Sequence, residues 1–458
     1  MDNEKIIKTI AETPAITLDK TVEAIGKVGQ AAHIEAPIKK TKEYWKILGP
    51  GLTTGAADDD CSGIATYSQQ GAKYGFQLNW LALITFPLMS TIQEMCARIG
   101  LVTGRGLASN IKKFFPRWVL VVSTLLLFGA NLFNIGADLG AMAESARLLL
   151  PGVSFTTLAV ACAIVTIALQ VFVSYRVYSK YLKYLSFALL AYVFTAFIPS
   201  VGMDWAGSFK HLVMPSITVS KDQIIMICAI LGTTISPYLF FWQTSQEVEE
   251  QTEVGMTSIK ARQQNIDPEQ ISKMKTDVWS GMFYGNIVMF FIVSVTATIL
   301  HNAGITNIET AADAANALRP IAGDNAYLLF AIGIIGIGLL AIPVLAGSFS
   351  YALTETFGWK EGLHHELKQA SAFYGVIILA ILIGLGINFV GLDPIKALIY
   401  SAVANGMAAP LLLVVIVLLA SNKRIMGQYA SGTVAKTLGW LCVALMTAAG
   451  VATIYSFF

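Results

Sequence analysis

Long apolar runs separated by short polar segments make up the chain from about residue 47 to its end. A helix needs about 20 mostly apolar residues to cross a hydrocarbon core about 30 Å thick. Eleven runs are long enough, at residues 47–72, 78–101, 117–146, 153–175, 181–200, 222–246, 277–301, 325–352, 371–390, 395–420 and 434–457. The pattern predicts an all-α integral membrane protein with eleven transmembrane helices in residues 46–458, after a polar tail at 1–45.

Composition supports lipid as the main surroundings of the chain. Hydrophobic residues make up 55% of the 458 residues and charged residues 13%, against roughly 25% charged in soluble domains. The net charge of +2 and the scattered basic residues argue against nucleic acid as a partner. We expect the lipid bilayer to be the partner of the apolar surface, and the protein to act as a monomer.

The positions of Lys and Arg predict the topology. If the tail at 1–45 is cytoplasmic, 25 of the 31 basic residues fall in that tail and in the loops on the same side. The other six are Lys73, Arg147, Lys210, Lys221, Arg319 and Lys396. This bias predicts a multi-pass cell-membrane protein with a cytoplasmic N-terminus and, after eleven spans, an extracellular C-terminus.

Three consecutive carboxylates, Asp58–Asp60, lie well inside the first apolar run. Ionisable groups at membrane depth are costly and normally face a cavity or a partner. Asp and Gly compete with helical backbone, so we expect the helix to unwind near Asp60–Gly63. Freed carbonyls beside carboxylates are the oxygen-rich surroundings that magnesium, calcium and manganese prefer. Asp58 and Asp59 could equally lie in a wet vestibule or pair with a basic group.

The sixth apolar run has a corresponding weak point at Pro237, which follows Gly232, Thr233 and Thr234. A break there exposes the carbonyls of Thr233 and Thr234, although a simple proline kink is the alternative. Runs one and six begin two halves of five runs each. Interrupted helices at matching positions are typical of inverted-repeat transporters with a site at the midplane. We find no nucleophile–base arrangement or HExxH motif, so we do not expect an enzyme.

With these residues in view, the chain resembles the NRAMP family of divalent metal transporters over nearly all of its length beyond the tail. The stretch 93–108, Gln-Glu-Met-Cys-Ala-Arg-Ile-Gly-Leu-Val-Thr-Gly-Arg-Gly-Leu-Ala, is very similar to the family's second-helix signature. Gly49-Pro50 and the stretch from Gly71 to Gly75 also fall at family spacing. The resemblance implies a LeuT-like inverted repeat of helices 1–5 and 6–10, with helices 1 and 6 broken, working by alternating access.

The two family metal motifs are altered in this chain. Where the family has Asp-Pro-Gly-Asn, positions 60–63 read Asp-Cys-Ser-Gly, and where it has Met-Pro-His, positions 236–238 read Ser-Pro-Tyr. The aspartate is kept, whereas the Asn and Met ligands and the His are lost. A thioether favours transition metals, so its loss removes a preference for softer ions. The smaller side chains enlarge the site and suit partly hydrated magnesium. The pattern resembles the NRAMP-related magnesium transporter subgroup.

We therefore predict import of Mg²⁺, and also Mn²⁺, as the transported substrate, with no cofactor. Asp60 is the expected central carboxylate and Thr233 a backbone ligand. The expected lining of a hydrated site is Asp59, Gly63, Ser236 and Tyr238.

Proton coupling is expected to be weak or absent. In the family, coupling runs through the sixth-helix His and acidic residues of the third helix. Here the five histidines all fall in loops or at the ends of apolar runs. The third run keeps Asp138, with Asn134 or Ile135 near the position of the family's second acid.

Two alternatives remain open. One is a proton-coupled Mn²⁺ or Fe²⁺ importer of the same fold, in which Cys61 or a nearby methionine supplies a soft ligand. The other is a sodium-coupled importer of an organic solute, against which the three aspartates argue. Among the remaining polar residues of the apolar runs, we expect Gln243 and Asn405 to make helix-to-helix hydrogen bonds, the alternative being that they bind water on the ion. We expect Glu94 and Arg98 to form an internal ion pair.

Overall fold

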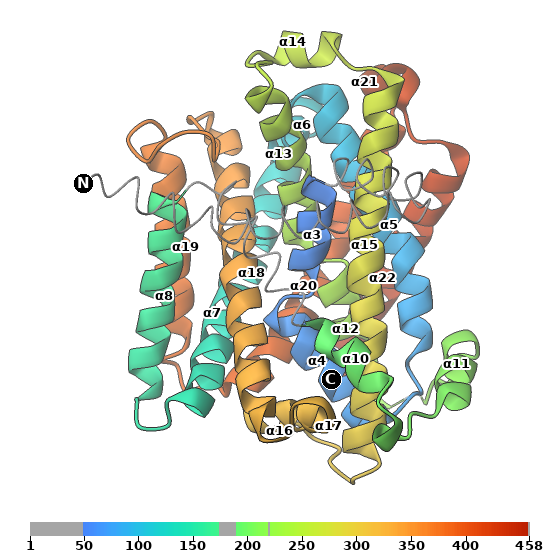
Figure 1. Ribbon diagram of the computed structural model, residues 1–458. Coiled ribbons are helices and arrows are strands. Elements are labelled where there is room, and N and C mark those ends of the chain that lie inside the picture. The colour runs from blue at the N-terminus through green and yellow to red at the C-terminus, as the bar shows by residue number, and fades with distance from the viewer. Residues whose placement is uncertain (1–48, 174–188, 219, 457–458) are drawn as a thin grey trace, which may run out of the picture. The chain divides into compact units, whose positions relative to one another are not determined.

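The computed structural model describes residues 49–173, 189–218 and 220–456, and every regular element in them is a helix (Figure 1). The chain divides into Met1–Gly49 and Pro50–Phe458, and the account below concerns the second unit. Its long helices are α5 (Trp80–Thr103), α7 (Arg117–Leu149), α8 (Phe155–Phe172), α15 (Pro268–Thr296), α18 (Ala326–Phe357), α19 (Ser371–Ile387), α20 (Pro394–Ser421) and α22 (Thr433–Ser456). Shorter connecting helices are α6 (Leu107–Phe114), α10 (Leu190–Ala196), α11 (Trp205–Val213), α14 (Ile259–Gln264), α16 (Ala311–Ala315), α17 (Arg319–Ala322) and α21 (Lys423–Met426).

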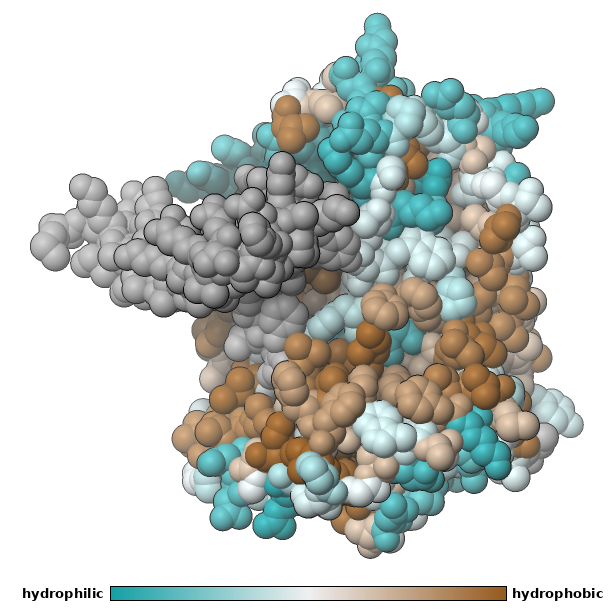
Figure 2. Space-filling model, turned by 45° about the vertical axis from the view of Figure 1, so that its right-hand side comes forward, coloured by the Kyte–Doolittle hydropathy of each residue, from teal (hydrophilic) through white to brown (hydrophobic). Residues whose placement is uncertain are grey.

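The predicted membrane class is confirmed. Seven helical segments of the described residues are long and apolar enough to cross a membrane, and α19 is a shorter apolar helix. On the face seen in Figure 2, apolar residues form a broad band with hydrophilic residues above and below it. The predicted number of eleven spans stays a prediction, because the fifth run at 181–200 lies partly outside the described residues.

The first predicted helix is broken into α3 (Pro50–Asp58) and α4 (Cys61–Tyr74). Asp60 has extended backbone and caps α4, since its side chain accepts a hydrogen bond from the Gly63 amide. An aspartate at this position satisfies a backbone donor that the helix start would otherwise leave without a partner. The expected unwinding near Asp60–Gly63 is confirmed at Asp59 and Asp60, and the cap lets the helix resume at Cys61.

The sixth predicted helix is broken into α12 (Lys221–Thr234) and α13 (Pro237–Glu253). Pro237 is the first residue of α13, where its missing N–H costs nothing and its fixed φ favours a helix start. Ser236 precedes it in extended conformation. This is a full break and not a proline kink.

Glycines let each broken helix approach a companion closely. A β-carbon at Gly55 of α3 would lie 2.1 Å from the carbonyl oxygen of Gly281 on α15, and one at Gly232 of α12 would lie 2.1 Å from that of Ala402 on α20. Such contacts are possible only where no side chain intervenes, which is how membrane helices gain packing energy without a hydrophobic effect between them. The two breaks are thereby fixed against α15 and α20.

Candidate metal site at the two helix breaks

Asp60 lies at the break of the first helix and is surrounded by hydrogen-bond donors. Its Oδ1 accepts from the Ser62 hydroxyl at 2.6 Å and the Gly63 amide at 2.8 Å. Its Oδ2 accepts from Asn134 Nδ2 at 2.8 Å and from the Tyr238 hydroxyl at 3.4 Å. The residue is only 1% exposed. All four donors are neutral, so they stabilise the carboxylate without cancelling its charge.

Asn134 connects the break to two other helices. It lies on α7, and its Oδ1 accepts a hydrogen bond from the Ser401 hydroxyl of α20 at 2.9 Å. From the sequence, Asn134 was noted only as lying near the position of the family's second acid, and Ser62 and Ser401 were not predicted to have a role. An amide inside an apolar run was the available signal for Asn134, since such groups need a partner at membrane depth. Which partner it has is a long-range contact that the sequence does not show.

The break of the sixth helix presents hydroxyls and carbonyls. The Ser236 hydroxyl lies 2.8 Å from the carbonyl oxygens of both Gly232 and Thr233 and donates to them. The Thr233 hydroxyl lies 3.2 Å from that of Ser62. The Thr233 carbonyl, predicted as a ligand, therefore carries a hydrogen bond already, but a carbonyl oxygen has a second lone pair that can bind a cation.

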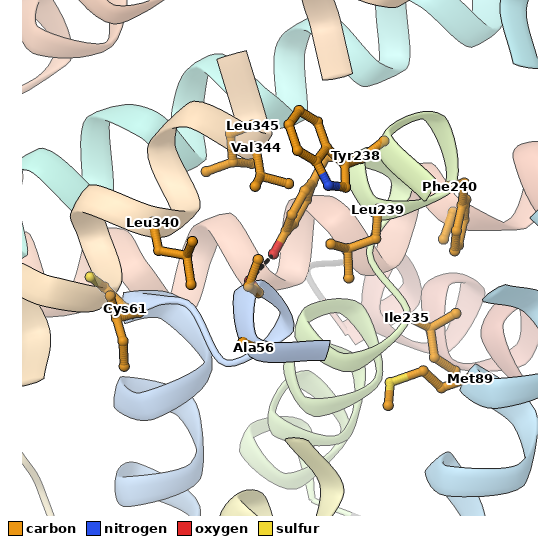
Figure 3. Packing of buried hydrophobic residues seen from close by; sticks show 14 of the residues in the cluster. Ala56, Cys61, Met89, Ile235, Tyr238, Leu239, Phe240, Leu340, Val344 and Leu345 are labelled. Atoms are coloured by element: carbon orange, nitrogen blue, oxygen red, sulfur yellow. Dashed lines mark hydrogen bonds between the residues drawn. The ribbon is translucent and has the colours of Figure 1, made fainter. Parts of the chain in front are cut away.

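Tyr238 links the two broken helices directly. Its hydroxyl donates to the carbonyl oxygen of Ala57 in the last turn of α3 at 2.9 Å, and it also lies within reach of Asp60. Figure 3 shows the ring reaching from α13 toward α3 beside Val344 and Leu345. The contact satisfies a carbonyl that the helix end leaves open. Tyr238 thus lies between the two breaks and beside Asp60.

The sulfur atom nearest the break in sequence is engaged elsewhere. The Cys61 thiol donates to the carbonyl oxygen of Ile334 on α18 at 3.5 Å, and Figure 3 shows the side chain beside Leu340. Within the described ranges, no group of three or more His, Cys, Asp or Glu residues is arranged to hold a metal ion. A cation at Asp60 would therefore be held by one carboxylate together with neutral oxygens and water.

The side chain of Asp59 faces α15 and not the groups around Asp60. A β-carbon at Gly285 of α15 would lie 3.4 Å from Asp59 Oδ2 and 3.8 Å from Asp58 Oδ2. Hydrogen bonds and neighbouring hydroxyls thus join Asp60, Gly63, Thr233, Ser236 and Tyr238, whereas Asp59 faces α15.

Three further predictions concern polar residues inside the apolar runs. The ion pair of Glu94 with Arg98 is confirmed. So is the interhelical bond of Gln243, whose Oε1 accepts from the Thr54 hydroxyl at 2.5 Å. The prediction for Asn405 is not matched, since neither atom of its buried amide has a hydrogen-bond partner.

Comparison with known protein families gives one match that covers most of the chain. The family described as "Natural resistance-associated macrophage protein-like" matches residues 51–456. The match begins at α3 and ends with α22, so it includes both breaks and every helix described above.

Similar curated proteins are bacterial divalent metal cation transporters named MntH. The protein from Caldanaerobacter subterraneus subsp. tengcongensis is 26% identical over 412 residues, covering 87% of this chain and 90% of the relative. The protein from Pectobacterium carotovorum subsp. carotovorum is 26% identical over 410 residues, covering 87% and 92%.

Solved structures support the same fold. The manganese transporter of Eremococcus coleocola, in complex with an aromatic bis-isothiourea substituted compound, superposes with a TM-score of 0.70 at 17% identity, covering 91% of this chain and 87% of that one. Mhp1, a nucleobase-cation-symport-1 family transporter in a closed conformation, gives 0.51 at 14% identity over 89% and 91%. These likenesses confirm the predicted LeuT-like fold.

Proposed function

Because this chain belongs to the natural resistance-associated macrophage protein family, we propose that it imports Mg²⁺, and also Mn²⁺, as partly hydrated ions. The members of the family that are similar to this chain are divalent metal cation transporters and not enzymes. The proposed site consists of Asp60 as the central carboxylate, the Thr233 carbonyl as a ligand, and Gly63, Ser236 and Tyr238 around it. Asp59 lines its α15 side.

The observation that carries the proposal is the chemistry around Asp60. One carboxylate is surrounded by hydroxyl, amide and carbonyl groups, and the nearby Cys61 thiol bonds to a carbonyl on α18. Magnesium is typically bound through one or two carboxylates while keeping several waters. A site without sulfur gives no advantage to softer transition metals.

The proposal includes little or no proton coupling. Tyr238 stands where the resemblance places a histidine, and a phenol does not exchange protons near neutral pH. Entry of the cation is then driven by its gradient and by the membrane potential, which contributes about 2.3 kcal/mol per charge per 100 mV.

The alternative is a proton-coupled Mn²⁺ or Fe²⁺ importer of the same fold. The names of the relatives favour it, since they include a manganese transporter. So does Asp138, a fully buried carboxylate on α7 with no hydrogen-bond partner, which interacts electrostatically with Asp60.

Flux into liposomes that contain an internal pH dye distinguishes the two. We expect Mg²⁺ uptake by the wild type without acidification, and none by Asp60→Ala. Unchanged uptake by Asp60→Ala would remove Asp60 from its role. Cadmium uptake accompanied by acidification of the lumen would establish the alternative instead.

Placement in the cell membrane as a monomer with a cytoplasmic N-terminus and an extracellular C-terminus is part of the proposal. Labelling of single cysteines at Lys8 and Lys436 in intact cells tests the topology, because both positions should be reached only after permeabilisation.

A further inference from the structure

Two carboxylates beside Asp60 lack the partners that Asp60 has. Asp58 is the last residue of α3 and Asp59 follows it, and each is 1% exposed. Neither oxygen of Asp59 has a hydrogen-bond partner, and neither does Oδ1 of Asp58. Burying a carboxylate without donors or a counter-charge is strongly unfavourable. In their charged form these two groups therefore need a positive partner.

The two side chains converge on one place on α15. If Gly285 carried a β-carbon, that atom would lie 3.4 Å from Asp59 Oδ2, 3.8 Å from Asp58 Oδ2 and 3.0 Å from the carbonyl oxygen of Gly55. Three oxygens from the end of α3 thus surround a point where the facing helix carries no side chain.

A fourth oxygen comes from α4. The Tyr67 hydroxyl is fully buried and has no hydrogen-bond partner. Its ring lies against the end of α3, since a β-carbon at Gly63 would lie 3.4 Å from Tyr67 Cε2 and 3.5 Å from the carbonyl oxygen of Asp58. An unpartnered phenol next to two unpartnered carboxylates is an independent sign that a ligand belongs between them.

The chemistry of these oxygens matches the proposed cargo. Two carboxylates, a hydroxyl and a carbonyl are hard ligands, and two carboxylates with retained waters are a typical magnesium environment. The pair is adjacent in sequence to Asp60, so two dications at once would repel each other strongly at this depth.

We propose that Asp58, Asp59 and Tyr67 form a second station for the transported dication on the α3 side of the break, occupied in alternation with Asp60. The inference rests on the proposed function and adds a step to it. The ion moves from one carboxylate to a neighbouring pair without crossing unfavourable apolar surface.

Binding of Mn²⁺ to the full-length protein, followed by electron paramagnetic resonance, tests the second station. Asp60→Asn should keep one Mn²⁺ site, weakened roughly 10- to 100-fold by loss of the neighbouring carboxylate. Adding Asp58→Asn and Asp59→Asn should abolish that residual binding. Adding Tyr67→Phe, which deletes one hydroxyl only, should weaken it several-fold and provides a milder variant should the triple variant not fold.

Asp138→Asn in the Asp60→Asn background is the matched control, since it also removes a buried carboxylate near Asp60 but on α7. It should leave the residual site in place. Absence of residual binding in Asp60→Asn would overturn the second station, as would residual binding that survives loss of Asp58 and Asp59 or is lost equally in the control. The proposed function fails separately, if the wild type itself carries no Mg²⁺ into liposomes.

Discussion

The carboxylate of Asp277, on α15, accepts a hydrogen bond from the backbone amide of Gly51 at the start of α3, at 2.6 Å. Its other oxygen accepts from the amide of Leu52 at 3.1 Å. The first amides of a helix have no partners inside it and carry partial positive charge, so a carboxylate there is doubly favourable. A residue 226 positions away thus supplies the cap of the half-helix that leads to Asp60.

Asp277→Asn should loosen the start of α3. An amide can accept at only one of the two positions and carries no charge, so we expect a loss of about 1–2 kcal/mol of local stability. Hydrogen exchange of peptides covering 50–58 should accelerate accordingly. Asp267→Asn, which makes the same change at the cap of α15 itself, is the control and should leave α3 unaffected. Equal exchange of α3 in both variants would contradict the role of Asp277.

Ser236→Met should move selectivity toward soft metals. The substitution restores a thioether where the Ser236 hydroxyl now binds the carbonyls of Gly232 and Thr233. Thioether sulfur favours transition metals over magnesium, so Cd²⁺ uptake should rise relative to Mg²⁺ uptake in liposomes. Ser236→Ala loses the hydroxyl without adding sulfur and should not gain cadmium transport. The same gain in both variants would mean that the size of the site, and not sulfur, decides selectivity.

Arg98→Gln should destabilise the protein through its partner. Glu94 is largely buried, pairs with Arg98 and accepts a hydrogen bond from the Trp279 indole at 2.8 Å. Removing Arg98 leaves the carboxylate of Glu94 with only the Lys275 ammonium, 3.9 Å away, as a counter-charge, and breaking a buried ion pair of this kind costs up to about 3 kcal/mol. The exposed pair of Lys273 with Glu269 gives the comparison, since Lys273→Gln should cost less than about 1 kcal/mol.

Thermal unfolding in detergent measures both changes. The double variant Glu94→Gln with Arg98→Gln should regain part of the loss, because no unpaired charge remains. Equal effects of Arg98→Gln and Lys273→Gln would show that the Glu94 pair behaves as a surface pair.

A group of titratable side chains attaches α13 to the loop between α18 and α19. The Glu249 carboxylate accepts from the Tyr351 hydroxyl at 2.7 Å and the Leu363 amide at 2.9 Å, and lies 2.5 Å from His364 Nδ1. Beside it, Glu361 accepts from the Thr354 hydroxyl at 3.0 Å. Other ionisable groups that face this cluster are Glu253, Arg262, Glu355, Lys360 and His365.

Stability of this attachment should fall as the pH rises. Burial, with a smaller contribution from Glu249, raises the pKa of Glu361 to about 7, and the hydrogen bond to Glu249 raises the pKa of His364. In both cases the folded protein binds more protons than the unfolded chain, so the contribution of each group to the free energy of unfolding is fully present at low pH. It is lost between about pH 4.5 and 7 for Glu361, and as the pH rises through the raised pKa for His364. The Glu361 contribution is at most about 3 kcal/mol.

Hydrogen exchange of the segment 358–370 at pH 5.5 and 8, corrected for intrinsic rates, measures this dependence. We expect weaker protection at pH 8. Glu361→Gln stays neutral throughout and should reduce the difference between the two conditions. Protection that is constant with pH, or a pH effect unchanged in Glu361→Gln, would contradict the assignment to Glu361.

Sequence alone was enough to place the two helix breaks and to mark Asp60 as a carboxylate at the first of them. A proline after two threonines and three aspartates between glycines weaken a helix wherever they occur, because these effects act within a few residues. The same local reasoning predicted Asp60 as a ligand and the pairing of Glu94 with Arg98 one helical turn away, whereas Tyr238 was predicted only through the resemblance to the family's sixth-helix motif.

Tertiary structure decided what surrounds those residues. Asn134 from α7 and Tyr238 from α13 reach Asp60, Asp277 from α15 caps α3, and Asp59 turns toward Gly285 rather than joining Asp60. A buried carboxylate must find donors among whichever helices pack against it, and that packing depends on small-residue contacts between segments about 170–230 positions apart in the sequence. Local pattern marks which residues need a partner, and only the assembled helices determine which partner each one has.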